Sequence, residues 1–353
     1  MANVHCLGCG LVGTFVVNRL ANLGHVIHVH EITEPPRLDS CDSIHVHLGD
    51  AIEHSKHLKE FGDVDFVVNM LPGDLGHQAT INLVDGGYRI IDLSFSEITP
   101  DKLHEIAKET GARLLWDVGI APGLSNMLIA YAARKGEGIV SAEVRVGGNP
   151  SEPDSEWSYM APFSPSDVIA EYTRPARIIR DRMESILPAL SERHRINVEG
   201  KGEMEAFLTD GLRSLLDTIP AQDMAEYTVR WPGHIQRYID EKKSGRLEPQ
   251  SLILDWKFDP NRPEFTWMEV KVDCENGEYF HWIIEDHGGS DGSSMARTTG
   301  LVTSSCVTEW ANSENIIEEG SYPPEILSDT VIYSIIQTMK DSGVEIRGPD
   351  IQL

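Results

Sequence analysis

The stretch Val4-His5-Cys6-Leu7-Gly8-Cys9-Gly10-Leu11-Val12-Gly13 is an apolar strand that runs directly into a Gly-x-Gly-x-x-Gly loop. An amphipathic helical pattern follows it, in Phe15, Val16, Val17, Leu20 and Leu23. A loop of this kind holds a pyrophosphate, because the N-terminus of the following helix presents backbone N–H groups to the negative charge. Gly8 would permit the tight turn, Gly10 would let the backbone approach the phosphates, and Gly13 would let helix and strand pack closely. The sequence therefore predicts dinucleotide binding, with Leu11 and Val12 in the first helical turn.

The choice of dinucleotide depends on Glu31, which ends the next apolar strand. A carboxylate at this place accepts hydrogen bonds from the adenosine ribose and repels a 2′-phosphate. Residues 32–36 bring no cation to offset that repulsion, and the first one is Arg37. We therefore expect NAD as the cofactor, in preference to NADP.

Length, charge and cysteine content limit the class of protein. A chain of 353 residues suggests about two domains. The 30 Lys and Arg against 56 Asp and Glu give a formal charge of −26, which disfavours nucleic acid and anionic membranes and leaves small molecules as the expected ligands. Five scattered cysteines, without a signal peptide or a membrane-spanning run, favour the cytoplasm. An acidic surface is also typical of a high-salt host, and the sequence leaves that open.

The first 120 residues alternate between strands and helices, which predicts an α/β fold with a doubly wound parallel sheet. We expect its strands at about 26–30, 44–47, 64–70, 89–93 and 113–118. Thr99 would cap a helix that has Pro100 in its first turn and Gly111 just beyond its end. Ligand-facing residues should lie near the carboxyl ends of the strands. These are Asp50, Asn69, Leu71, Pro72, Asp92 and Gly119 for the cofactor, with Ser94 and Asp117 nearer the substrate.

A change of pattern after residue 138 indicates a second, α+β domain with a largely antiparallel sheet. Val140, Ala142, Val144 and Val146 alternate with polar residues, as in a half-buried strand. Runs 265–274 and 279–286 flank Glu275-Asn276-Gly277-Glu278, a strong hairpin signal. An apolar helical tail follows, in Val331, Ile332, Ile335, Ile336 and Met339. We expect residues 1–122 with 295–353 to form the dinucleotide-binding domain, and 123–294 to form the domain for substrate binding and dimerisation.

Six further motifs give the chain a specific resemblance. They are Asp117-Val118-Gly119-Ile120-Ala121-Pro122-Gly123-Leu124-Ser125-Asn126, Gly147-Gly148-Asn149-Pro150, Glu171-Tyr172, Glu205-Ala206-Phe207-Leu208-Thr209-Asp210-Gly211-Leu212, Thr228-Val229-Arg230-Trp231-Pro232-Gly233-His234 and Ser294-Met295-Ala296-Arg297-Thr298-Thr299-Gly300. In these motifs the chain resembles the saccharopine dehydrogenase family over nearly its whole length, and its lysine 6-dehydrogenase branch in particular. The resemblance implies an NAD(P)-dependent oxidoreductase acting on a C–N bond of an amino acid, usually as a homodimer held by the second domain. Saccharopine reductases of this family carry Asp-Pro-Gly where Ala121-Pro122-Gly123 stands here, which speaks against saccharopine as substrate.

Amine oxidation needs an anchor for the substrate carboxylate and a group that takes the ammonium proton. Arg230 suits the anchor, because a planar guanidinium binds a carboxylate with two hydrogen bonds and stays charged. Thr228, which matches the family's Thr-x-Arg, would add a hydroxyl. His234, Glu171 and Asp117 are the candidates for the proton acceptor, and the sequence does not choose among them.

Other side chains allow both a binding and a structural interpretation. Tyr159 and Tyr172 would line the substrate site or belong to the core, and Arg297 would close over a ligand or cap a helix. His28 and His30 share one strand face, as do His45 and His47, but no accompanying ligand pattern predicts a metal. Cys6 and Cys9 are spaced like a redox pair, yet we expect them to be incidental, because one lies on a buried strand and the other within the glycine turn.

These observations favour NAD-dependent oxidative deamination of the terminal amine of L-lysine, or of a similar amino acid, with release of ammonia. Two alternatives remain at this point. One is a saccharopine- or opine-type reductase acting on a secondary amine, and the other is an NAD-binding protein without catalysis.

Overall fold

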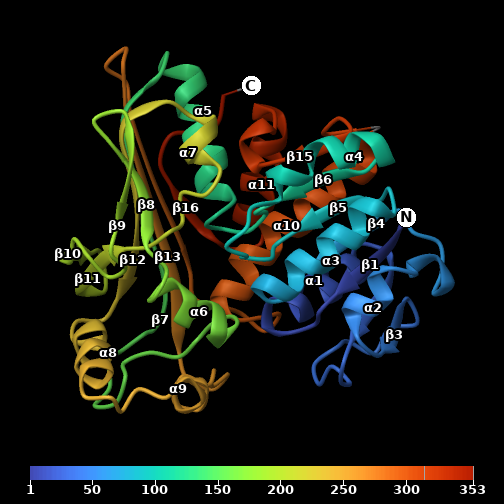
Figure 1. The fold of residues 1–353 in the computed structure, drawn as a ribbon, viewed down its shortest axis with the longest axis horizontal. Coiled ribbons are helices and arrows are strands. Elements are labelled where there is room, and N and C mark those ends of the chain that lie inside the picture. Colours follow the sequence, from blue (N-terminus) through green and yellow to red (C-terminus); the bar gives the residue numbers. More distant parts are fainter. Residues whose placement is uncertain (314, 353) are drawn as a thin grey trace. The chain divides into compact units, whose positions relative to one another are not determined.

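The computed structural model describes residues 1–313 and 315–352, which fold into two compact units (Figure 1). Unit 1 comprises Met1–Met127, Ala296–Asp341 and Ile351–Leu353, and unit 2 comprises Leu128–Met295 and Ser342–Asp350. The predicted boundaries at 122/123 and 294/295 lie within five residues of two of these changes. The prediction for the tail differs at residues 342–350, which belong to unit 2 rather than to the dinucleotide-binding unit.

Unit 1 is built on a seven-stranded, wholly parallel sheet in the order β15-β6-β5-β4-β1-β2-β3. Its strands are β1 (Asn3–Leu7), β2 (Val26–Glu31), β3 (Ile44–Leu48), β4 (Phe66–Asn69), β5 (Arg89–Asp92), β6 (Arg113–Trp116) and β15 (Gly320–Tyr322). The order turns outward in both directions from β1 and β4, as in a doubly wound fold. The α/β class and the predicted parallel sheet are confirmed.

Helices connect these strands. They are α1 (Leu11–Asn22), α2 (Ala51–Ser55), η1 (Leu58–Glu60), α3 (Gly73–Asp85), η2 (Pro100–Leu103), α4 (His104–Thr110), η3 (Pro324–Ile326) and α11 (Asp329–Asp341), together with most of α10 (Ser294–Asn312). The five apolar residues predicted for the tail are the buried residues of α11. Gly111 ends α4 in the left-handed conformation, as predicted. Thr99 occupies the N-cap position of η2 with Pro100 in the first turn, as predicted, but its hydroxyl donates to the Asp101 carboxylate and makes no capping hydrogen bond.

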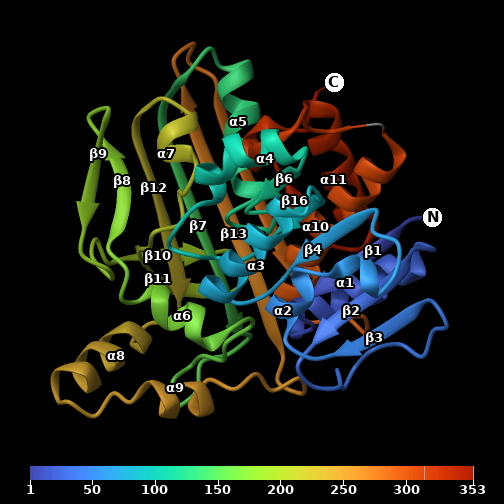
Figure 2. The same cartoon turned by 45° about the vertical axis from the view of Figure 1, so that its right-hand side comes forward.

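Unit 2 is built on a nine-stranded sheet in which β10-β11-β12-β7-β13-β14-β16 are successive neighbours, with β8 paired to β12 and β9 to β8 (Figure 2). Its strands are β7 (Ile139–Pro150), β8 (Ala176–Arg180), β9 (Met183–Leu187), β10 (His194–Val198), β11 (Gly202–Leu208), β12 (Ala221–Arg230), β13 (Glu264–Cys274), β14 (Tyr279–Asp286) and β16 (Glu345–Arg347). Its helices are most of α5 (Leu124–Lys135), α6 (Pro165–Glu171), α7 (Leu215–Thr218), α8 (His234–Lys243) and α9 (Pro249–Asp255). Among the described strands of this second sheet only the pairing of β7 with β12 is parallel, which confirms a largely antiparallel sheet.

The predicted hairpin is present. β13 and β14 pair antiparallel from Thr266 with Asp286 to Asp273 with Tyr279, and Gly277 adopts a φ of 87° in the turn. Along β7, Ala142 and Val144 are buried as expected, whereas Val140 is exposed. The alternation therefore indicated the strand correctly but overestimated its buried length.

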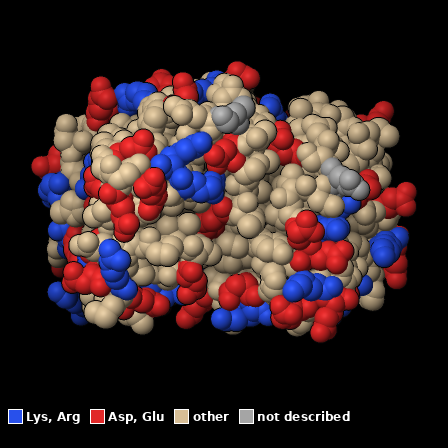
Figure 3. Space-filling view, turned by 90° about the horizontal axis from the view of Figure 1, so that it is seen from above, with Lys and Arg blue, Asp and Glu red and all other residues tan. Residues whose placement is uncertain are grey.

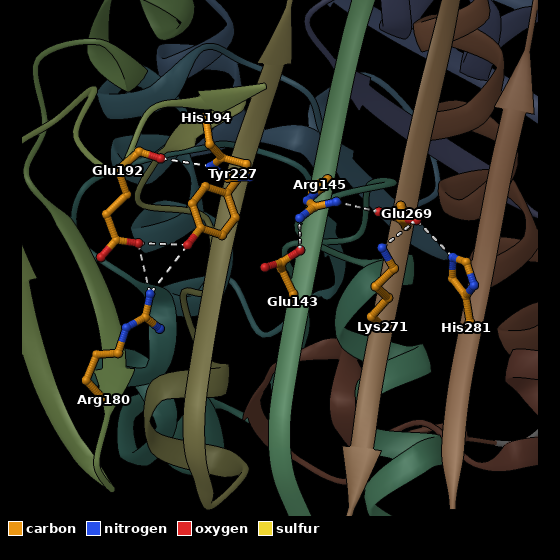
Figure 4. A network of polar contacts seen from close by, with 9 residues as sticks. All are labelled: Glu143, Arg145, Arg180, Glu192, His194, Tyr227, Glu269, Lys271 and His281. Atoms are coloured by element: carbon orange, nitrogen blue, oxygen red, sulfur yellow. Dashed lines mark hydrogen bonds and ion pairs between the residues drawn. The ribbon is translucent and has the colours of Figure 1, made fainter. Parts of the chain in front are cut away.

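One face of the unit 2 sheet carries a network of charged side chains (Figure 4). The Glu269 carboxylate accepts from Arg145 at 3.1 Å, from Lys271 at 2.9 Å and from His281 at 2.9 Å. Successive residues of a strand point to opposite faces. Tyr227 of β12 lies on the face shown in Figure 4, so Thr228 and Arg230 point to the other one, which holds the candidate substrate site.

The charged side chains of one face show how the acidic excess is distributed there. On the face shown in Figure 3, Asp and Glu are interspersed with Lys and Arg among uncharged residues. Within the described residues, no helix combines the length and hydropathy needed to cross a membrane.

Candidate functional site

The glycine loop joins β1 to α1 with the geometry that a phosphate needs. Gly8 has a φ of 86°, and its N–H donates to the carbonyl of His30 at 3.0 Å. A Cβ on Gly13 would lie 2.7 Å from the Gly8 carbonyl oxygen, so helix and strand approach as closely as predicted. A Cβ on Gly10 would meet nothing within 4 Å. The open space at Gly10 and the N–H groups of the first turn, at Leu11, Val12 and Gly13, fit a pyrophosphate.

Glu31 lies beside this loop. Its Oε2 accepts from the Cys9 N–H at 2.7 Å, and its Oε1 accepts from the Ile32 N–H at 2.8 Å. These bonds fix a carboxylate at the end of β2, where the ribose of a dinucleotide would lie. The residues present therefore fit NAD.

The remaining candidates for cofactor binding fall into two groups. Asp50 accepts from the Ile52 N–H at 2.8 Å and thus caps α2, while Leu71, Pro72 and Gly119 lie in loops after strands. Asn69 and Asp92 are instead buried and bonded to protein groups. The Asn69 amide donates to the Gly76 carbonyl and to the Thr80 hydroxyl, each at 2.9 Å. Asp92 accepts from Thr80 and from the Ser94 N–H, and burial raises its pKa to about 6.

In unit 2, three elements bring polar side chains to Arg230. Arg230 ends β12, and Gly233, with a φ of 94°, turns the chain into α8 so that His234 follows closely. Helix α6, begun by the Ser164 cap and Pro165, delivers Glu171 as its last residue and Tyr172 as its C-cap. Buried aromatic residues pack around this group, among them Trp157, Tyr159, Phe207, Tyr238 and Trp256.

The Arg230 guanidinium is 3% exposed and makes several contacts. Its Nε donates to the Tyr172 hydroxyl at 2.9 Å, and its Nη1 donates to the Val229 carbonyl at 3.0 Å. It lies over the Tyr159 ring at 4.5 Å from the ring centroid, and Nη2 is 3.4 Å from the Tyr159 hydroxyl. Its carboxylate partner, Glu171, forms an ion pair at 3.5 Å from Nη2 but no hydrogen bond. The guanidinium therefore retains capacity to bind an incoming carboxylate.

The orientation of Arg230 is set by a hydrogen-bond chain that runs to the backbone. The Trp157 carbonyl can only accept, and the neutral His234 imidazole holds one proton, so Nε2 accepts from the Tyr172 hydroxyl at 3.0 Å; that hydroxyl in turn accepts from Arg230. His234 Nδ1 then carries the proton and donates to the Trp157 carbonyl at 2.8 Å. Burial, with the charge of Arg230, lowers the pKa of His234 to about 3. His234 is thus a neutral, fully bonded imidazole, which fits a positioning role better than that of a proton acceptor.

Glu171 has a different environment. Its side chain is 18% exposed, and its Oε2 makes no hydrogen bond with the described residues. Burial raises the pKa of this carboxyl to about 7, against the opposing effect of Arg230. Glu171 is therefore a carboxylate that forms an ion pair with the anchor but whose Oε2 accepts no hydrogen bond from the described residues.

Thr228 lies on the same strand face as Arg230, and its hydroxyl is 2.9 Å from that of Thr209. The other predicted residues, Ser94, Asp117 and Arg297, belong to unit 1. All three are buried, and Asp117 has a φ of 55° in the loop after β6. The structure thus brings Arg230, Tyr159, Tyr172, Glu171 and His234 together within unit 2.

Several contributors were missed from sequence. Trp157 contributes its backbone carbonyl, which accepts from His234 Nδ1. Every residue has such a carbonyl, so the residue type in the sequence does not indicate this role. Trp256 packs against His234, with ring centroids 5.5 Å apart, and only its apolar surroundings could have suggested a core residue. Thr80 bonds both Asn69 and Asp92, although it lies more than ten positions from each.

A second polar cluster lies in unit 1 at β1, β2, β3 and α2. We call it the histidine ladder; its members are His5, His28, His30, His45, His47 and His54. His5 Nδ1 is 3.0 Å from His30 Nε2, His28 Nδ1 is 3.0 Å from His47 Nε2, and His30 Nδ1 is 3.1 Å from His54 Nδ1. Burial lowers the pKa of His5 to about 4 and that of His30 to about 2. No group of three or more His, Cys, Asp or Glu residues in the described part of the chain has the arrangement of a metal site.

Comparison with known proteins adds the family. Over its full length the fold is similar to saccharopine dehydrogenase (L-Glu forming) from Saccharomyces cerevisiae, with a TM-score of 0.74, 15% identity, and 98% and 99% of the two chains covered. It is also similar to a homospermidine synthase from Legionella pneumophila, solved in complex with NAD, with a TM-score of 0.67, 13% identity, and 99% and 92% covered. Residues 119–344 match the saccharopine dehydrogenase C-terminal domain. Because that match spans more than half of the chain, the protein belongs to the saccharopine dehydrogenase family.

Proposed function

We propose that the protein is an NAD-dependent dehydrogenase that oxidises the terminal amine of L-lysine, or of an amino acid of similar length. The observation that carries this proposal is Arg230, a buried guanidinium packed among aromatic side chains, whose ion-pair partner Glu171 lies 3.5 Å away. It suits the α-carboxylate of an amino acid. The homospermidine synthase complex with NAD and the fit of the glycine loop support the cofactor.

Bound NAD would accept a hydride from the carbon next to the reacting nitrogen. The glycine loop and Glu31 would hold the cofactor, and Arg230 would hold the carboxylate end of the substrate. The ammonium must first lose its proton, after which loss of the hydride leaves an iminium ion. Water adds to the iminium carbon, the C–N bond breaks, and the semialdehyde and ammonia leave.

We look for the group that accepts the ammonium proton among residues that are not part of the hydrogen-bond chain from Arg230 to the Trp157 carbonyl. His234 fits this role poorly, because both of its ring nitrogens are bonded. Asp117 stays a candidate from unit 1. The position of Glu171 next to Arg230 favours a role at the carboxylate end of the substrate instead.

The test uses purified protein with NAD and L-lysine and no added oxo acid. We expect NADH and ammonia to appear together, and faster at alkaline pH, because a lysine ammonium with a pKa of about 10.4 must be deprotonated first. NADH formed only from saccharopine or another secondary amine, without ammonia, would show the opine-type reaction instead. We also propose a homodimer, which sedimentation would test.

A further inference from the structure

We propose that Glu171 is the receptor for the α-ammonium group of the substrate, so that Arg230 and Glu171 together recognise the zwitterionic end of an L-α-amino acid. The proposal rests on the proposed role of Arg230 as carboxylate anchor. It assigns Glu171 to substrate selection rather than to proton transfer at the reacting nitrogen.

The position of Glu171 carries the first step. Its Oε2 lies 3.5 Å from Arg230 Nη2. In an α-amino acid the amino nitrogen is two bonds from the carboxyl carbon. A carboxylate bound to Arg230 therefore brings its α-ammonium within reach of a carboxylate that stands this close to the guanidinium.

The hydrogen bonding of the Glu171 carboxylate is incomplete. Its Oε2 lacks a hydrogen bond among the described residues and is enclosed, although the side chain as a whole is 18% exposed. A buried acceptor without a donor is costly, so such an atom calls for an explanation. An ammonium group would supply N–H donors and a positive charge to this oxygen, which has an ion pair with Arg230 at 3.5 Å but accepts no hydrogen bond from the described residues.

Glu171 lies at the wrong end of the substrate to accept a proton from the terminal amine. In L-lysine the terminal nitrogen is five bonds from Cα, so it lies far from the carboxyl end. Glu171 is held next to Arg230 by its place at the end of α6, one residue before Tyr172, which is itself bonded to Arg230. It therefore cannot serve both the α-ammonium and the terminal amine. If Arg230 binds the α-carboxylate, Glu171 faces the α-nitrogen.

The carboxyl group also responds to its environment. Its pKa is raised to about 7, chiefly by burial, and the carboxylate of Asp167 adds to the shift. A cation bound beside it favours the ionised form. Binding of an α-amino acid near pH 7 should therefore release protons from the part-protonated Glu171 carboxyl group. Binding of the corresponding acid without the α-amino group should release fewer protons.

The experiment compares ligands that differ in this one group, using the NAD-saturated protein. For turnover, the ligands are L-lysine and 6-aminohexanoate, which lacks the α-ammonium. We expect Glu171→Gln to lower kcat/KM for L-lysine by about 10- to 100-fold, mainly through KM, as loss of a charged hydrogen bond would. With 6-aminohexanoate the change should stay within about threefold. The matched control is Asp167→Asn, which removes a carboxylate one turn earlier on α6 and should leave the preference for L-lysine intact.

A binding measurement separates this proposal from the proposed reaction. L-Norleucine and hexanoate carry no terminal amine, so calorimetric titration tests recognition without turnover. We expect Glu171→Gln to weaken the binding of L-norleucine but not that of hexanoate. The substitution should also abolish the extra proton release on L-norleucine binding, which is measured by titration in two buffers of different ionisation enthalpy. The proposal would be overturned if Glu171→Gln weakened L-norleucine and hexanoate equally, or lowered kcat/KM equally for L-lysine and 6-aminohexanoate. A loss in kcat alone, with a changed pH profile, would also overturn it and would make Glu171 a proton acceptor. If L-norleucine binds as expected but L-lysine is not oxidised, only the proposed reaction fails.

Discussion

At the scale of single residues, Arg230 combines a buried charge with a rigid set of neighbours. The chain from Arg230 through Tyr172 and His234 to the Trp157 carbonyl leaves each polar group one direction in which to donate. Such a chain holds the guanidinium plane without neutralising it. The arrangement is suited to binding a planar anion with defined orientation.

This geometry makes the substitution Arg230→Lys informative. Lysine keeps the positive charge but loses the planar fork and the Nε–H bond to Tyr172. We expect KM for the amino acid to rise at least about tenfold, with NAD affinity unchanged, because Glu31 and the glycine loop belong to the other unit. Steady-state kinetics and NAD titration measure both. Arg237→Lys, on the pair with Glu241 in α8, serves as the control. Unchanged KM in the Arg230 variant would remove Arg230 from the substrate site.

Glu31 permits a second test at this scale. Its carboxylate is fixed by the Cys9 and Ile32 N–H groups, so it would stand close to a 2′-phosphate and repel it. We expect a strong preference for NAD over NADP in kcat/KM, and Glu31→Gln should narrow that preference. Glu34→Gln, at a nearby exposed position, should not. Equal efficiency of the unmodified protein with NADP would contradict the assignment.

At the scale of secondary-structure elements, the histidine ladder links β1, β2, β3 and α2. His5 and His30 are buried, and their rings bond each other, so a proton on one ring disturbs its neighbours. The unfolded chain has ordinary histidine pKa values near 6.5. Their lowered pKa values, about 4 and about 2, mean that below pH 6.5 the unfolded state binds more protons than the folded state. The free energy of unfolding must then fall as the pH falls.

We therefore expect the free energy of unfolding to drop between pH 6.5 and 4 by about 1.4 kcal/mol per pH unit for each of these two histidines. Urea denaturation at a series of pH values measures this slope. His30→Gln should reduce this slope by about 1.4 kcal/mol per pH unit, the contribution of one proton. This holds whether or not the substitution lowers the free energy of unfolding at neutral pH. His57→Gln, at an exposed histidine outside the ladder, should leave it unchanged. A slope that is the same in both variants would show that the ladder does not control acid stability.

At the scale of the whole molecule, features that depend on neighbours in sequence could be predicted, and those that depend on distant pairing could not. The glycine loop and the turn at Gly277 are local, and both are present as expected. Strand β16 has three residues, too few for a pattern, and is defined by its pairing with β14. At the site, Arg230, Tyr172 and Glu171 could be named from sequence. The neutral, bonded state of His234 could not, because it depends on the carbonyl of Trp157.

The order of the strands also bears on synthesis of the chain. Strand β6 ends at Trp116, but β15, its outer neighbour, begins only at Gly320. At a translation rate of about 5–20 residues per second, roughly 10–40 s separate their emergence from the ribosome. During that interval the edge of β6 is open to pairing with other chains. Unit 1 is thus begun before unit 2 and completed after most of it, and a nascent chain of this protein should need chaperone cover at that edge until residues 320–322 have been made.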